Sequence, residues 1–205
     1  MSRIVNAPEA RRYRSELRAE QAEETRRRIL DAALRVTATG LASLSIPAVA
    51  REAGVSVPTV YRHFGTKAEL LAAMYPHAAR KAGLDRVPEP STVADVGSVV
   101  RAIIERLDAM DDVSRAALAS PIADEVRHAT MPSRLARVRR LVESIDPPLS
   151  KPALDRVTRL LVVLLSSSAL RMWRDHLGVP ADQVAEDVDW ILRAAIAAAR
   201  SEDAA

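Results

Sequence analysis

Apolar residues recur at helical spacing along most of the chain, and no stretch shows the strict alternation of a half-buried strand. A clear example lies in residues 22–39, where Ile29, Ala32 and Val36 share one helix face before Gly40. The pattern predicts an all-α fold of about nine helices. We expect them near residues 22–39, 46–53, 57–64, 66–82, 92–109, 113–119, 121–144 with a break near Pro132, 152–177 and 181–200.

Two short helices, at residues 46–53 and 57–64, carry start and stop signals. Ser45 and Ser56 are each placed to cap a helix N-terminus with a side-chain oxygen. Gly54 supplies the left-handed backbone conformation that commonly ends a helix. These signals predict two helices joined by a glycine turn, which is the layout of a helix-turn-helix unit.

The second of these helices turns its polar side chains outward, because Val60 and Phe64 are four residues apart and point inward. The helix contains no carboxylate, so its outer face suits a polyanion. In a helix-turn-helix unit, the first turn of the second helix enters the major groove. Here that turn holds Val57, Pro58 and Thr59.

Arg62 follows on the outer face of the same helix. Its two-pronged guanidinium either reads the edge of a guanine or holds a phosphate, and the sequence leaves both roles open. His63 is not expected to act as a catalytic base, because no constellation of carboxylate or serine residues surrounds it.

The segment from about Thr25 to Ala72 resembles the DNA-binding domain of the tetracycline-repressor (TetR) family of transcriptional regulators. The resemblance is carried by Thr25–Leu34, Ala50–Gly54, Thr59–Phe64, Lys67 and Glu69–Leu71. It implies that Tyr61, His63 and Lys67 contact phosphates. Two alternatives remain open, since Tyr61 can instead pack against Phe64 and His63 can be a surface residue without a role. The expected DNA contacts are Ser45, Ser56, Val57, Pro58, Thr59, Tyr61, Arg62, His63 and Lys67.

The chain departs from the family pattern at Pro47, where family members often carry a polar residue that reaches DNA. Proline has no N–H with which to bond a phosphate. Residues 1–20 are polar and rich in arginine, and we expect them to start disordered and become helical toward Glu20. One hypothesis is that this arm supplies the missing contact to the DNA backbone or minor groove. The alternative is a solvated tail.

Charge and composition agree with a nucleic-acid reader joined to a larger body. Residues 1–67 carry 12 basic and 7 acidic side chains, whereas the whole chain has a net charge of only +3. The chain has no cysteine, which excludes disulfides, thiolate metal sites and thiol nucleophiles. No apolar run approaches the length of a membrane span, and the N-terminus does not resemble a signal peptide. We therefore expect a cytoplasmic protein that is not an enzyme and needs no metal or cofactor.

The resemblance also implies a division of labour, in which residues 1–67 bind DNA and residues 68–205 bind an effector and a partner subunit. Methionine adapts to varied apolar ligands, and it interrupts the alanine, leucine and valine of the later helices. The candidate effector-lining residues are Met74, Met110, His128, Met131, Met172 and Trp173. Each of these has the alternative of being an ordinary core or surface residue.

The last two predicted helices are apolar around more of their circumference than one neighbour covers. The first carries Leu160, Leu161, Leu164, Leu165, Ser168 and Met172, and the second carries Val184, Val188, Ile191, Leu192, Ala195 and Ala198. In the resembling family, such helices pair with their symmetry mates as a four-helix bundle. The alternative is a core within one chain.

These features predict a homodimeric repressor that binds palindromic operator DNA and is released by a small lipophilic effector. The first rival is a DNA-binding regulator that responds to no effector, and an absence of any apolar cavity would favour it. The second rival is a helical enzyme, for which the sequence offers no nucleophile, base and orienting group within one segment.

Overall fold

The computed structural model describes residues 7–40 and 44–203, and helices account for nearly all of its regular structure. The α-helices are α1 (Ala7–Ala38), α2 (Ile46–Ala53), α3 (Val57–Phe64), α4 (Lys67–Lys81), α5 (Val96–Asp108), α6 (Asp112–Ala119), α7 (Ala123–Glu143), α8 (Lys151–Leu164), α9 (Ser167–Arg171) and α10 (Ala181–Asp203). Short 3₁₀ turns cover Leu84–Arg86 and Val93–Asp95, and one π-helical stretch covers Met172–His176. The all-α prediction is confirmed. No helix within the described ranges is long and apolar enough to cross a membrane.

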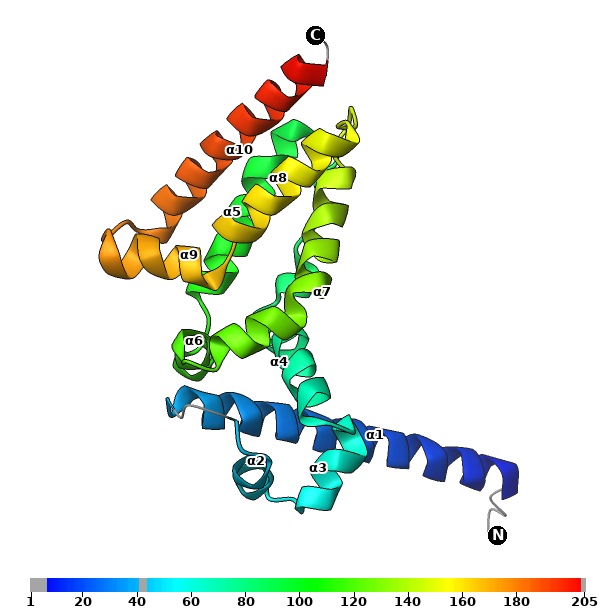
Figure 1. Ribbon diagram of the computed structural model, residues 1–205. Helices are drawn as coiled ribbons and strands as arrows, with labels where there is room; N and C mark the ends of the chain where they lie inside the picture. Colours follow the sequence, from blue (N-terminus) through cyan, green and yellow to red (C-terminus); the bar gives the residue numbers. More distant parts are fainter. Residues whose placement is uncertain (1–6, 41–43, 204–205) are drawn as a thin grey trace.

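The helices form two packed groups (Figure 1). At one end, α1 lies across the molecule with α2 and α3 against it, and α4 leads away from α3 toward the other helices. At the far end, α10 packs on α5 and α8, and α8 also packs on α7. The apolar core around α1 includes residues of α2, α3, α4, α6 and the start of α7. A second core joins α5, α8 and α10.

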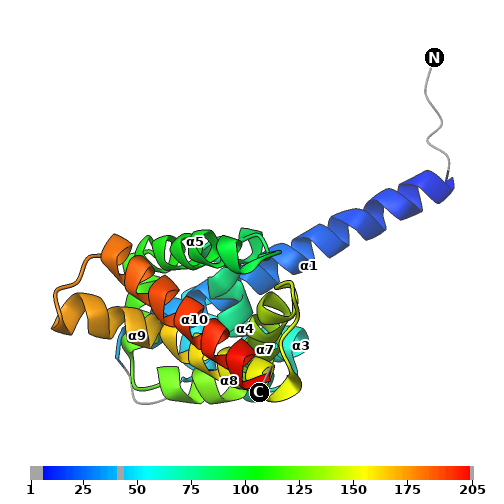
Figure 2. The same ribbon diagram turned by 90° about the horizontal axis from the view of Figure 1, so that it is seen from above.

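The first helix is longer than the sequence predicted, because α1 begins at Ala7 and not near residue 22. Its N-terminal half projects beyond the rest of the molecule, which Figure 2 shows from above. Arg12 and Glu16 form an ion pair of 2.9 Å one turn apart, and such pairs stabilise a solvated helix. The expectation of a disordered start is therefore wrong from Ala7 onward. Residues 1–6 of the predicted arm lie outside the described residues.

The predicted helix over residues 152–177 is also wrong, since the structure divides it after Leu164. The Ser166 hydroxyl donates to the Val163 carbonyl oxygen at 2.7 Å and accepts from the Ala169 N–H at 3.1 Å. A serine that bonds the backbone on both sides ends one helix and caps the next. Apolar spacing alone runs through this junction, which is why periodicity did not reveal it.

The break expected near Pro132 is absent, and α7 continues through it. Pro132 lies on the exposed side of the helix, where water can solvate the carbonyl group that loses its N–H partner.

An ion pair joins the end of α4 to the start of α6. Asp111 caps α6 by accepting from the Ser114 N–H at 3.0 Å, and its other oxygen lies 3.1 Å from the Lys81 ammonium. Burial alone would raise the Asp111 pKa, but the bonds from Ser114 and the Lys81 charge outweigh it and lower the pKa to about 2. The ionised carboxylate is therefore stabilised in the folded state.

We predict that Asp111→Asn lowers the free energy of unfolding at pH 7 by about 1 kcal/mol, a value that allows for solvent screening of this half-exposed pair. Asparagine still caps a helix, so the loss reports the charge. Because the folded-state pKa is depressed, this contribution is present above about pH 4 and disappears as the pH falls toward 2. Urea unfolding of the wild type and of Asp111→Asn across this pH range measures the difference in the free energy of unfolding. The control is Asp112→Asn, at a fully exposed carboxylate, and a pH-independent difference for Asp111→Asn would contradict the assignment.

Candidate nucleic-acid interface

The caps predicted around α2 and α3 are confirmed. Ser45 accepts from the Ala48 N–H at 3.4 Å, and Ser56 accepts from the Thr59 N–H at 3.3 Å. Gly54 has φ 63° and ψ 38°, the left-handed conformation that ends α2. These local signals fix the angle at which α3 leaves the turn. The α3 helix is therefore presented in a defined orientation on the surface.

Two arginines of α1 brace the ends of α2 and α3. The Arg26 guanidinium donates to the His63 carbonyl oxygen at 3.2 Å and lies over the Phe64 ring, 4.3 Å from its centroid. Arg28 donates to the Ala53 carbonyl oxygen at 2.6 Å. Sequence reasoning missed this role, since basic residues in a DNA reader suggest phosphate contacts. The one available signal was their place in a helix whose other face is apolar.

The outer face of α3 is formed by residues with different exposure. Pro58 and Arg62 are exposed, and the Tyr61 side chain is 46% exposed. Val57 is half-buried and packs against the core around α1. The Thr59 hydroxyl lies 2.8 Å from the Ser56 hydroxyl, so part of its hydrogen-bonding capacity serves the cap.

Arg62 makes no side-chain hydrogen bond or ion pair among the residues that the structure describes. The same holds, within those residues, for Arg51 on the exposed last turn of α2. Arg51 was not among the sequence candidates, although its place in the last turn of α2 was readable. Lys67 differs from both, because its ammonium lies 3.6 Å from the Glu125 carboxylate of α7.

His63 is half-buried at the end of α3. Burial lowers its pKa below the ordinary value of 6.5, and the nearby Arg62 and Arg26 cations lower it further. The imidazole is therefore mostly neutral at pH 7 and offers a single N–H donor. The pKa would rise beside a phosphate, because an anion favours the charged ring.

This region matches known proteins. Residues 29–74 match the family model described as bacterial regulatory proteins of the tetR family. Over 88 residues, or 42% of its length, the chain is 39% identical to the HTH-type transcriptional regulator SrpR of Pseudomonas putida. It is 38% identical, again over 88 residues and 42% of its length, to the uncharacterized HTH-type transcriptional regulator TtgW, also of Pseudomonas putida. Residues 29–74 therefore have the sequence of a TetR-type DNA-binding region. The matched stretch spans 41% of SrpR and 66% of TtgW.

Solved structures extend the likeness to most of the chain. It resembles the multidrug binding protein EbrR, solved in complex with imidazole, with a TM-score of 0.60 and 26% identity over 84% of this chain and 90% of EbrR. A transcriptional regulator from Rhodococcus sp. Rha1 shares the fold, with a TM-score of 0.58 and 24% identity over 83% of this chain and 95% of that one. The curated relatives are named as regulators, which supports the expectation that this chain is not an enzyme.

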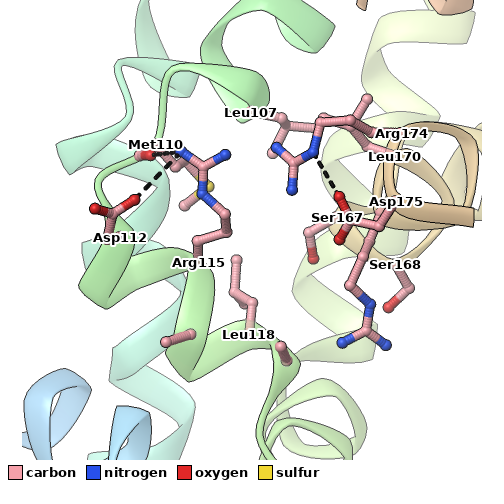
Figure 3. Close-up of a pocket in the computed structure, with 13 residues that line it drawn as sticks. Leu107, Met110, Asp112, Arg115, Leu118, Ser167, Ser168, Leu170, Arg174 and Asp175 are labelled. Atoms are coloured by element: carbon pink, nitrogen blue, oxygen red, sulfur yellow. Dashed lines mark hydrogen bonds and ion pairs between the residues drawn. The ribbon is translucent and has the colours of Figure 1, made fainter. Parts of the chain in front are cut away.

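The structure has a cavity of about 260 Å³ between α6 and the stretch from α9 to the π-helical turn (Figure 3). Arg115 and Arg174 lie on opposite sides of it, and Arg174 is paired with Asp175 at 2.7 Å. Of the six candidate effector residues, Met110 lines this cavity. Met74 belongs to the core around α1, His128 and Met172 are exposed, and Met131 and Trp173 are half-buried elsewhere.

Several of the α10 residues that we expected to pair with a second subunit are instead buried within this chain. Val184, Val188 and Leu192 are buried in the core with α5 and α8. Trp190 is 72% exposed and Val163 is 65% exposed, and Leu160 is partly exposed beside Val163 on α8. The neighbouring helices α8 and α10 therefore both carry large apolar side chains on their outer surface.

Proposed function

We propose that this protein is a homodimeric transcriptional repressor. It binds a palindromic operator through α3 and releases it when a small molecule binds among the helices of residues 68–205. Residues 1–67 bind DNA, and residues 68–205 bind the effector and the second subunit. The observation that carries the proposal is the rigidly capped α3, whose exposed outer face holds Pro58, Tyr61 and an Arg62 that is unpaired within the described residues.

The proposed docking places the first turn of α3 deepest in the major groove. Pro58 and the Thr59 methyl group meet thymine methyl groups there, and Arg62 reads guanine. Tyr61, His63 and the N-terminal end of α4 hold phosphates. Lys67 joins them after exchanging its long contact with Glu125 for a phosphate oxygen. Ser45 and Ser56 act by fixing the two helices, and Val57 acts by packing beneath the contact surface.

We predict that Arg62→Ala weakens operator binding by about 1–3 kcal/mol and relaxes the base preference at one position of each half-site. The operator is obtained by selecting duplexes from a random pool with the wild-type protein. Fluorescence anisotropy then measures the affinity for the selected duplex and for each single-base variant.

The matched control is Arg86→Ala, which removes the same charge from an exposed 3₁₀ turn away from α3. Equal losses of operator affinity in the two variants would mean that Arg62 contributes only its charge. A uniform loss across all base variants would reduce Arg62 to a phosphate contact.

The N-terminal half of α1 is proposed as a further backbone contact, because it projects at the same end of the molecule as α3 (Figures 1 and 2). We predict that deleting residues 1–18 reduces the slope of log affinity against log salt by about 0.9 for each phosphate that this segment binds. Titrations at several salt concentrations measure the slope. An unchanged slope would leave this segment as a solvated helix.

The proposed effector control is supported by two features. The cavity between α6 and α9 gives a small molecule a place to bind, which favours this function over a regulator without an effector. EbrR, which the chain resembles, is named as a multidrug binding protein. An effector that binds one dimer conformation better than the other shifts the spacing of the two α3 helices, and α4 transmits the change. A coupling of about 1–3 kcal/mol weakens operator binding roughly 5–150-fold.

A further inference from the structure

One arginine of α7 lies inside the protein. The Arg134 side chain is 8% exposed, and its guanidinium stacks over the Tyr75 ring of α4, 3.7 Å from the centroid. Its Nε and Nη2 atoms are buried and have no hydrogen-bond partner in the described part of the chain. Burial lowers the pKa of Arg134, and Arg127 lowers it further, yet an arginine keeps its charge at neutral pH. Although the Tyr75 ring attracts the cation, a buried charge without a hydrogen-bond acceptor or counter-charge is costly.

Arg134 lines a cavity of about 70 Å³ between α4, α5, α7 and the start of α9. The other walls are mostly apolar, with Ile103, Leu141 and Leu165 among them. This cavity adjoins the larger one of Figure 3, because both are lined by Leu107, Met110, Leu118 and Ser167. Arg134 lies in the wall of the smaller cavity, and the charged residues of the larger one are Asp112, Arg115, Arg171, Arg174 and Asp175.

No carboxylate is among the described residues that line the smaller cavity. The second cation there is Arg137, whose guanidinium already donates to the Leu84 carbonyl oxygen. Two donor nitrogens of Arg134 therefore have no hydrogen-bond acceptor within the described residues, and the cavity wall offers the hydroxyls of Ser166 and Ser167 but no carboxylate. An anion that enters this cavity from outside can supply the missing hydrogen-bond acceptor.

We propose that the effector is an amphipathic carboxylate, whose acid group pairs with Arg134 and whose apolar body extends past Leu107 and Leu118 into the larger cavity. The inference rests on the proposed function and changes its expectation of a purely lipophilic effector. A guanidinium binds a carboxylate through two parallel hydrogen bonds, which gives geometric selectivity as well as affinity. Since Tyr75 belongs to α4, the occupied site also contacts the helix that leads to α3.

The test compares octanoate, 1-octanol and octylamine, which share one alkyl chain and differ in the head group. Isothermal titration with the DNA-free, full-length protein measures each dissociation constant. We expect octanoate to bind at least about tenfold more tightly than octanol, and octylamine to bind more weakly than either. Arg134→Met removes the charge and keeps the alkyl stem, and it should reduce the preference for octanoate over octanol to about one.

Two further variants locate the site. Arg134→Lys keeps a charge but not the paired donors, and should retain a reduced preference for octanoate. Arg171→Met removes a cation from the adjoining cavity and should leave the preference intact. Unliganded Arg134→Met should melt at the same temperature as the wild type or higher, because it removes a buried charge that lacks hydrogen-bond acceptors, while the methionine side chain can still pack on the Tyr75 ring.

Equal affinity of the wild type for octanoate and octanol would overturn the proposal, whether or not any variant folds. So would a preference for octanoate that survives Arg134→Met, or one that is lost in Arg171→Met. A strongly lowered melting temperature in Arg134→Met would assign the residue to the fold and also contradict the proposal. If octanoate binds through Arg134 but leaves the DNA complex intact, the anion site stands and the proposed effector control fails.

Discussion

Replacing Val163 with arginine is expected to convert the protein into a monomer and to lower operator affinity at least about 100-fold. Val163 is 65% exposed on α8, and a twofold interface would bury it twice. Two buried guanidinium groups without counter-charges would then oppose association, and Arg159 one turn earlier adds a like charge. A single α3 helix makes too few contacts to hold an operator at physiological salt. Light scattering gives the mass, and anisotropy gives the affinity.

The control for this experiment is Ala136→Arg, which places the same side chain on the exposed face of α7. It should leave both the mass and the affinity close to those of the wild type. A Val163→Arg protein that stays dimeric and binds the operator normally would remove α8 from the proposed interface.

Truncating Phe64 to alanine is expected to lower the free energy of unfolding by about 3–5 kcal/mol. The ring is buried in the core around α1, and its face is covered by the Arg26 guanidinium. Its removal leaves a cavity beneath α3 and releases Arg26 from one of its two interactions. Chemical denaturation measures the stability, and operator affinity should fall with it because α3 loses its fixed orientation.

Tyr61→Ala is the matched control, since Tyr61 is an aromatic residue of the same helix that is 46% exposed. We expect its stability to change by less than about 0.5 kcal/mol, while its operator affinity falls. A large loss of stability in Tyr61→Ala would show instead that this ring packs in the fold.

The features that sequence reasoning obtained correctly depend on neighbours within one or two turns. Ser45, Gly54 and Ser56 act on backbone groups three or four residues away, so their roles are readable without a structure.

The features that sequence reasoning missed depend on segments that lie far apart along the chain. Arg26 and Arg28 look like surface cations until α2 and α3 fold against them. Arg134 shares the buried stripe of Val126 and Thr130, at intervals of four residues, and that spacing was the one available sign of its burial. No sequence pattern, however, places Tyr75 over its guanidinium. The division between α8 and α9 was hidden because the apolar residues on both sides keep one helical period.

Selection of DNA by the purified full-length protein from a random duplex pool tests the central proposal most directly. If two copies of α3 read adjacent major grooves, the enriched duplexes will share an inverted repeat whose half-sites lie about one helical turn apart or somewhat more. The selected complex will contain two protomers for each repeat. Enrichment of no sequence, or of a single unrepeated half-site bound by one protomer, would contradict the account.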